Sequence, residues 1–290
     1  MLATTAIAGL VLGGTYALVA LGLTLQYGIA RIMNLAYGEI IIAAAFLAYV
    51  LYHGLGVNPV AGLLVVVPAG FAFGYALYGL MMRPLVARAK DRAGLETDSI
   101  LATFGVLFVI QGVMLVAFGS NYTSYSFLNV GVDVLGATMA ANRLLALCLA
   151  VALAGGLYLL LTRTRWGTAL RAVAVAPQSA PLVGIDVDRM ARFAFALGAA
   201  LAAAGGVVIS MYQTFTATSG VVFTMKALIV VIMGGVGNLP GALSAGLILG
   251  LAETVIATHV DPGLTLAATY AIFLAVLLWR PSGLFGRAAR

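Results

Sequence analysis

Long apolar segments alternate with short polar stretches along the whole chain. A helix needs about 20 apolar residues to cross the hydrocarbon core of a bilayer. Segments that approach or exceed this length lie at residues 5–26, 36–52, 60–82, 99–119, 143–162, 192–213, 222–236, 240–258 and 264–280. The pattern predicts an all-α fold, a polytopic membrane helix bundle of about 8–10 transmembrane helices. Residues 1–290 are expected to form a single transmembrane domain.

The first segment is expected to be a membrane span and not a removed signal peptide. It begins MLATTAIAGLVLGG, without a positively charged region, and its apolar run continues past residue 20. A signal peptide would require a cleavage site after this run, and the sequence shows no convincing one.

Two later segments are short, and a third region is interrupted. Residues 36–52 and 222–236 fall below the length of a full span, and the glycine-rich join around 234–241 predicts a break. Broken helices are tolerated within a membrane only where protein or a water-filled cavity satisfies the freed backbone groups. The interruptions therefore indicate the region of a translocation pathway. Length alone leaves open whether the two short segments cross fully.

The composition excludes a water-soluble globule. Hydrophobic residues make up 63% of the chain and charged residues 8%, and the mean hydropathy is +1.12. A soluble domain usually carries about 25% charged residues. The 35 glycines are not periodic, and in a membrane bundle small residues let helix backbones approach closely. Cys148 stands alone, so neither a disulfide framework nor a cysteine metal site is expected.

The net charge of +6 comes from basic residues scattered between the apolar segments, a distribution that does not favour nucleic-acid binding. Cytoplasmic loops of membrane proteins carry an excess of Lys and Arg. Nine spans place the basic regions on one side, with the N-terminus and residues 120–142 outside and the C-terminus in the cytoplasm of a bacterial inner membrane. These regions contain Arg31; Arg83, Arg88, Lys90 and Arg92; Arg163, Arg165, Arg171, Arg189 and Arg192; and Arg280, Arg287 and Arg290.

Three ionisable residues stand out within the apolar segments: Glu39, Lys226 and Glu253. Such residues are costly in a membrane and are functional candidates by default. Glu39 either reaches water near the interface or, if buried, caps a helix start or pairs with Arg31. Lys226 either extends its long stem to the outer surface or pairs with Glu253, which would neutralise the cost of both charges.

The loop at residues 163–191 is too polar to span but has an ordered pattern. Gly167–Ala176 has helical spacing with Leu170 and Val173 on one side. Pro177 interrupts this helix, and Ser179 is expected to cap a second short helix that ends at Gly184. The loop is either a plain solvated connection or a docking element for a soluble partner.

No catalytic constellation emerges from the sequence. The glycine-rich stretch 234–241 lacks the Gly-Lys-Ser/Thr ending that holds phosphate and Mg²⁺, so any ATP hydrolysis must come from another subunit. His53 and His259 are expected in short outside loops, solvated and without further ligands at metal spacing. Glu96 and Asp98 are expected to balance the nearby basic cluster. A non-catalytic protein without a metal site is predicted.

Four stretches, in order, carry a family resemblance. They read GGTYALVALGLTLQYGIARIMNLAYGEI, ALRAVAVAPQSAPLVGIDVDRMARFAFALGAALAAAGGV, KALIVVIMGGVGNLPGALSAGLILGLAET and LLWRPSGLFG. Together they resemble the permease subunits of branched-chain amino acid ABC importers over essentially the whole chain. That family usually has His at the position of Tyr37. Tyr cannot perform a role that needs an imidazole, so this chain can differ from the family in the substrate that it transports.

The resemblance implies a set of partners in the bilayer and on both sides of it. They are a second permease, identical or homologous, two ABC ATPases that use ATP and Mg²⁺, and a periplasmic or extracellular substrate-binding protein. This chain would bind no cofactor of its own. The 163–191 loop would insert into a cleft of an ATPase through Leu170, Arg171, Ala172, Ala176, Ala180, Leu182, Gly184 and Ile185.

The same resemblance, together with the interrupted segments, gives a set of pathway candidates. They are Asn34, Tyr37, Gly38, Glu39, Lys226, Gly234, Gly235, Gly237, Asn238, Pro240 and Glu253. The implied substrate is a branched-chain amino acid, with urea, short amides or aromatic acids as alternatives within the family. A rival class is an ion-coupled secondary transporter, in which Glu253 would titrate. A membrane enzyme is disfavoured because no cluster of His or acidic residues is present.

Overall fold

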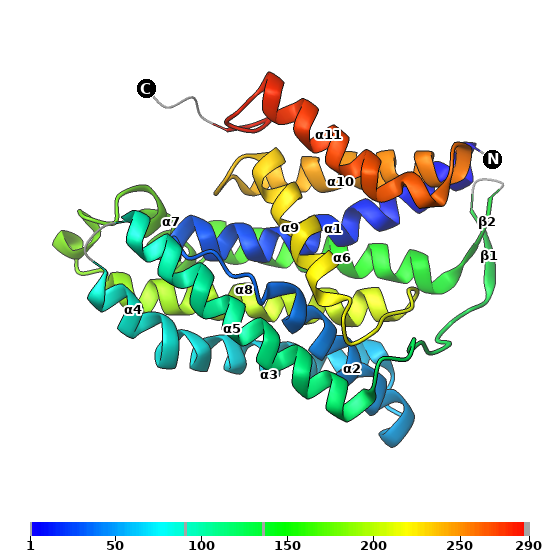
Figure 1. Cartoon of the computed structure of the whole chain (residues 1–290), viewed down its shortest axis with the longest axis horizontal. Coiled ribbons are helices and arrows are strands. Elements are labelled where there is room, and N and C mark those ends of the chain that lie inside the picture. The colour runs from blue at the N-terminus through cyan, green and yellow to red at the C-terminus, as the bar shows by residue number, and fades with distance from the viewer. Residues whose placement is uncertain (1, 90–91, 135–136, 287–290) are drawn as a thin grey trace.

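The computed structural model is a bundle of long helices with one β-hairpin at its edge (Figure 1), and it describes residues 2–89, 92–134 and 137–286. Lys90, Arg287 and Arg290 lie outside the described residues. The helices are α1 (Leu2–Ala30), α2 (Tyr37–Leu55), α3 (Pro59–Leu77), α4 (Arg83–Arg88), α5 (Arg92–Phe118), α6 (Ala141–Arg163), α7 (Arg165–Val175), α8 (Val187–Ser210), α9 (Gly220–Gly234), α10 (Leu239–His259) and α11 (Thr265–Trp279).

Short elements connect these helices. A π-helical turn, η1 (Tyr78–Met82), joins α3 to α4, and single 3₁₀ turns form η2 (Ala180–Val183) and η3 (Pro262–Leu264). Strands β1 (Gly131–Val134) and β2 (Ala137–Ala140) pair antiparallel, with Val132 opposite Met139.

Eight helical stretches of the described chain are long and apolar enough to cross a membrane. The predicted segment 36–52 corresponds to the 19-residue α2, which meets this criterion, whereas 222–236 corresponds to α9, which has only 15 residues. The predicted membrane bundle is therefore confirmed, and α9 is its short element. The break predicted near 234–241 is the turn between α9 and α10.

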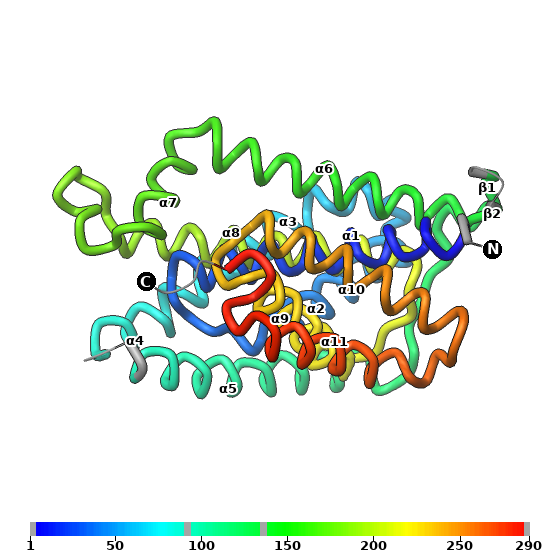
Figure 2. Tube along the Cα trace, turned by 90° about the horizontal axis from the view of Figure 1, so that it is seen from above, coloured from blue at the N-terminus to red at the C-terminus, as the bar shows by residue number. Residues whose placement is uncertain are grey.

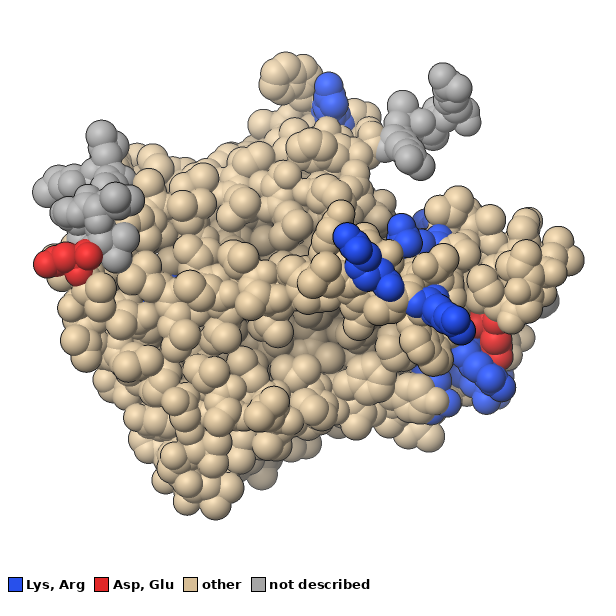
Figure 3. All heavy atoms as spheres, turned by 180° about the vertical axis from the view of Figure 1, so that it is seen from behind, with Lys and Arg blue, Asp and Glu red and all other residues tan. Residues whose placement is uncertain are grey.

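The two ends of the bundle differ in charge. Figure 1 shows the N-terminus and the β-hairpin at one end, with α4 and α7 at the other. We call these the hairpin end and the arginine end. Figure 3 shows Lys and Arg side chains gathered over the arginine end, as expected if the basic regions share one side of a membrane. Figure 2, which views the bundle from above, shows α5 and α6 on opposite sides of the central helices.

Small residues let the central helices pack closely. Gly9 and Gly13 of α1 face Gly246 and Gly250 of α10, so that a Cβ on any of them would meet the backbone of the other helix. The four-residue spacing on both helices puts each pair on one face. Close backbone approach of this kind drives helix association in membranes, where lipid supplies no hydrophobic force between helices.

The 163–191 region has the predicted order, with local differences. Leu170 and Val173 of α7 are buried against the bundle, and the second short helix is a 3₁₀ turn that ends at Gly184 with φ 77°. The prediction that Ser179 caps this turn is wrong, because its side chain accepts no capping hydrogen bond. A single 3₁₀ turn leaves few free N–H groups for a cap to satisfy.

The histidines also differ from expectation. His53 lies in the last turn of α2 and His259 ends α10, so neither is in a loop, although both are exposed. Both α2 and α10 extend beyond the apolar segments 36–52 and 240–258, so each histidine falls within its helix.

The α1–α10 contact predicts a specific stability effect. Gly250→Ala adds a methyl group against the backbone of Gly13, whereas a Cβ at Gly155 in α6 meets nothing within 4 Å. Because overpacking forces helices apart, we expect Gly250→Ala to cost about 1–3 kcal/mol and to lower the unfolding temperature in detergent. Gly155→Ala should not lower it, since Ala favours helix. Equal unfolding temperatures for the two variants would contradict the packing.

Candidate translocation site and coupling surface

An extended segment, residues 31–36, separates α1 from α2 inside the bundle, and Figure 1 shows α2 beginning near the middle of the bundle's length. Asn34 is fully buried in this segment and accepts a hydrogen bond from the Ala36 N–H at 3.1 Å. Its Nδ2 donates to Gln26 Oε1 at 3.2 Å, and Gln26 Nε2 donates to the Phe195 carbonyl at 2.9 Å. Asn34 therefore supports the non-helical backbone, which water cannot do at this depth.

Two hydroxyl groups from other helices complete this support. The Thr103 hydroxyl of α5 accepts a hydrogen bond from the Leu35 N–H at 3.1 Å. The Thr224 hydroxyl of α9 accepts from the Gly38 N–H at 2.8 Å. The start of α2 is thus tied to both α5 and α9.

Glu39 lies where the N-terminal ends of α2 and α9 meet. Gly38 and Gly220 contact each other there, and a side chain on Gly220 would overlap the Glu39 carboxyl group. Glu39 is fully buried, and neither of its carboxylate oxygens has a hydrogen-bond partner among the described residues. It therefore neither caps α2 nor pairs with Arg31, as the sequence had left open. The positive dipole ends of α2 and α9 both lie beside this carboxyl group.

Lys226 and Glu253 form the predicted ion pair. Lys226 Nζ lies 2.6 Å from Glu253 Oε1, and the two side chains are only 12% and 11% exposed. The Tyr16 hydroxyl donates to Glu253 Oε2 at 3.0 Å and accepts a hydrogen bond from Lys226 Nζ. This triad of Tyr16, Lys226 and Glu253 joins α1, α9 and α10, so Lys226 does not extend to the surface.

Tyr37, the residue found where the family usually has His, is completely buried. Its hydroxyl donates to the Val19 carbonyl of α1 at 2.7 Å. The phenol therefore joins α2 to α1, and a role as a pathway side chain would require this bond to break.

The glycine-rich candidates gather in the turn between α9 and α10. Gly235 and Gly237 have φ of 98° and 79°, which only glycine adopts readily. Asn238 Oδ1 caps α10 by accepting from the Gly241 N–H at 3.1 Å, and its Nδ2 donates to the Phe285 carbonyl at 2.8 Å. Gly234 packs on Gly241, and Pro240 occupies the first turn of α10. This turn lies a full helix, about 21 Å, from the other end of α9.

The coupling-loop candidates divide into anchors and exposed positions. Leu170 and Ala180 are buried, and Ala172 and Ile185 are half-buried. Arg171, Ala176 and Gly184 are exposed, and Leu182 is 86% exposed beside Val183 at 74%. Leu182 and Val183 form an apolar tip on a segment that is otherwise rich in charge. An exposed apolar tip indicates an interaction surface.

Aromatic and charged contacts hold the base of this loop. Trp166 stacks on Phe193 at 5.2 Å, and the Arg192 guanidinium lies 3.6 Å from the centre of the Tyr75 ring. An ion pair of 3.2 Å joins Arg83, at the start of α4, to Asp188 in α8. The tip is therefore exposed while its base is fixed to α3 and α8.

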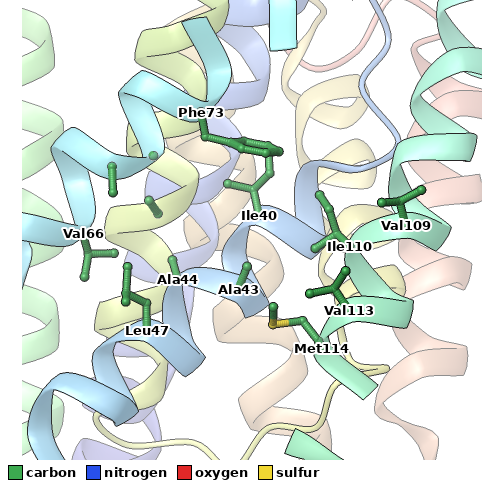
Figure 4. Close-up of a pocket in the computed structure, with 13 residues that line it drawn as sticks. Ile40, Ala43, Ala44, Leu47, Val66, Phe73, Val109, Ile110, Val113 and Met114 are labelled. Carbon is green, nitrogen blue, oxygen red and sulfur yellow. The ribbon is translucent and has the colours of Figure 1, made fainter. Parts of the chain in front are cut away.

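A large groove between α2, α3 and α5 is entirely apolar. It has a volume of about 380 Å³, and Figure 4 shows Ile40 of α2 beside Phe73 of α3 and Ala43 of α2 beside Met114 of α5. With no polar group to bind a solute, this groove cannot orient a charged or polar substrate.

Sequence reasoning missed four polar residues that this arrangement depends on. Tyr16, Gln26, Thr103 and Thr224 each bond a candidate residue or the extended segment. Only Gln26 carried a signal, as a lone amide in the first apolar segment. Thr and Tyr are common in membrane helices, so their spacing alone does not single them out.

A multi-span bundle with buried charges, a broken span and an exposed apolar tip defines a membrane transport subunit. Residues 5–279 match the family described as branched-chain amino acid transport system / permease component, and the chain belongs to this family. It is 29% identical to the high-affinity branched-chain amino acid transport system permease proteins LivH of Escherichia coli and BraD of Pseudomonas aeruginosa. Each match covers 96% of this chain and 94% of the relative.

A solved structure shows the same fold. PsaBC from Streptococcus pneumoniae in complex with Fab contains a chain that matches with a TM-score of 0.51 at 12% identity. The match covers 98% of this chain and 93% of that chain.

The triad predicts compensation between two charge reversals. Lys226→Glu or Glu253→Lys alone places like charges in a buried site, and breaking such a pair costs about 3–5 kcal/mol. The double reversal should recover most of the unfolding temperature and of the yield of folded protein. Arg189→Glu is the control, because the Arg189 side chain is 82% exposed and surface pairs contribute about 0–1 kcal/mol. A double variant as unstable as either single variant would contradict the pairing.

Proposed function

We propose that this chain is the permease subunit of a bacterial ABC importer that moves branched-chain amino acids into the cytoplasm. The family match over residues 5–279 carries the proposal, since LivH and BraD are named for this transport and align along nearly their whole length. A second permease, two ATPases that hydrolyse ATP and an external substrate-binding protein complete the transporter.

The charge distribution supports an orientation. Basic side chains gather at the arginine end (Figure 3), which the positive-inside rule assigns to the cytoplasm of the inner membrane. The hairpin end, with the N-terminus, then faces outside, and the exposed tip at Leu182 and Val183 faces the ATPases. Movement of the ATPases would reach α8 through the fixed base of the loop.

A groove beside the extended segment supports a position for the pathway. It has a volume of about 260 Å³, lies between α5 and α9 and has an almost wholly apolar surface, with Gln111 and Thr224 as the polar residues of its wall. Thr224 also bonds the start of α2, next to Glu39. A second permease facing this groove would close it into a channel, and displacement of α9 would expose Glu39 to a solute.

The rival ion-coupled mechanism gains no support from the geometry. It requires Glu253 to exchange protons or ions freely, but Lys226 and Tyr16 occupy both of its oxygens. Urea, short amides and aromatic acids remain alternative solutes, and direct competition separates them from leucine.

The proposal predicts ATP-driven uptake that depends on the exposed tip. Vesicles that contain the assembled transporter, with ATP inside and the binding protein outside, should accumulate leucine, and isoleucine and valine should compete where urea and benzoate do not. Leu182→Asp places a charge in an apolar contact, so we expect about a tenfold or greater loss of ATPase co-purification and of uptake.

The control for this change is Val130→Asp. Val130 is 63% exposed, but it lies in the loop at the hairpin end, so this variant should retain the ATPases. If the Leu182→Asp variant retained the ATPases fully, the proposed contact between this tip and the ATPases would be wrong. Absence of ATP-dependent leucine uptake by the wild-type transporter would remove the proposed substrate.

A further inference from the structure

A second polar cavity lies at the hairpin end, separate from the α2–α9 junction. It has a volume of about 310 Å³, within the range of roughly 300–1,000 Å³ found for small-molecule sites. Its walls come from the loop before β1, the start of α6, and the end of α8 with the residues that follow it. Unlike the groove of Figure 4, it is lined mainly by polar side chains.

Two tyrosines in this wall can only accept further hydrogen bonds. The Ser210 hydroxyl donates to the Val207 carbonyl at 2.8 Å, so in its 2.8 Å contact with Tyr125 the phenol must be the donor. Each hydroxyl has one proton, and once it is donated only lone pairs remain.

The same reasoning holds for Tyr212. Thr15 donates to the Leu12 carbonyl at 2.8 Å, so Tyr212 is the donor in its 2.9 Å contact with Thr15. Burial raises the pKa of Tyr125 and of Tyr212 to about 12, so both keep these protons at neutral pH. Both phenol oxygens therefore have only lone pairs left for a further hydrogen bond.

Asn142 adds a third acceptor, and this one has no partner. Its Nδ2 donates to the Met211 carbonyl at 2.9 Å, which fixes the orientation of the amide. Its Oδ1 has no hydrogen-bond partner among the described residues, although the residue is only 7% exposed. A buried acceptor without a donor costs free energy, so a ligand that supplies an N–H is stabilised there.

Next to these acceptors, Arg143 supplies a positively charged hydrogen-bond donor. It lines the cavity, is exposed, and forms no ion pair with the acidic residues that the structure describes. A guanidinium with free N–H groups binds a carboxylate through two parallel hydrogen bonds.

We propose that this cavity binds a free α-amino acid, with Arg143 on its carboxylate and the oxygens of Asn142, Tyr125 and Tyr212 around its ammonium group. This inference rests on the proposed function, because it makes the cavity an outer loading site that the solute occupies before it reaches the pathway. The donor and acceptor groups match a zwitterion and match neither an amide nor a simple acid equally well.

The contacts of Tyr212 also lead from the cavity into the bundle. Tyr212 bonds Thr15, and the next residue, Tyr16, bonds Lys226 and Glu253. The cavity and the buried triad are therefore both attached to the same turn of α1.

Equilibrium binding to the assembled transporter, without nucleotide or binding protein, tests the site. Radiolabelled leucine is the probe, and leucinol, which lacks the carboxylate, and 4-methylpentanoate, which lacks the ammonium group, are the competitors. Arg143→Gln should weaken leucine binding about tenfold or more while leaving leucinol unaffected. Arg143 is exposed, so this variant is expected to fold.

Asn142→Leu tests the acceptor side, and Asn121→Leu is its control. Asn121 is exposed in the same loop region and does not line the cavity. Asn142→Leu should reduce the preference for leucine over 4-methylpentanoate, and Asn121→Leu should not. Thermal unfolding of both variants separates a binding effect from misfolding.

The outcomes distinguish the site from the proposed function. If the wild type imports leucine while Arg143→Gln leaves leucine binding unchanged, the loading site is overturned and the function stands. If the wild type imports no branched-chain amino acid but leucine binding is lost in Arg143→Gln, the site stands and the function falls. Absence of leucine binding to the wild type at millimolar concentration overturns the site.

Discussion

Residues 31–36 place non-helical backbone inside a membrane bundle, and the rest of the structure depends on satisfying that backbone. Lipid offers no hydrogen bonds, so each free N–H must find a protein partner. Asn34 and Thr103 supply such partners within the segment, and Thr224 does so at Gly38. Because these side chains come from three separate parts of the chain, the segment between α1 and α2 fixes the positions of α2, α5 and α9 together.

The two buried acidic groups of the bundle have opposite surroundings. Glu253 is neutralised by Lys226 and Tyr16, and that triad holds α1, α9 and α10 as one unit. Glu39 has no partner among the described residues and is enclosed by the contact between Gly38 and Gly220. A paired charge resists separation of its helices, whereas a buried carboxyl group without a hydrogen-bond partner gains free energy from a movement that supplies one. In the proposed transport cycle, displacement of α9 has to break the Gly38–Thr224 hydrogen bond at this junction before Glu39 meets a solute.

Much of this arrangement follows from local sequence, and part of it does not. Segment lengths predicted the membrane bundle and its short element. The free-energy cost of a single charge within a membrane predicted the Lys226–Glu253 pair. The environment of Glu39 was not predictable, because it depends on the start of α9, 181 residues further along the chain at Gly220. The partners of Gln26 and Thr224 were not predictable for the same reason, since the Phe195 carbonyl and the Gly38 N–H reach these side chains only in the tertiary fold.

Thiol accessibility at Thr224 tests most directly the proposed opening of the α2–α9 junction during transport. Cys148, which is exposed, is first replaced by Ser, and Thr224→Cys is then introduced, with Ala146→Cys as a buried control between α1 and α6. If the junction opens, a membrane-impermeant thiol reagent labels the Thr224→Cys variant in one nucleotide state of the assembled transporter and not in another, while the Ala146→Cys variant stays protected. Equal labelling at 224 in every state would contradict it.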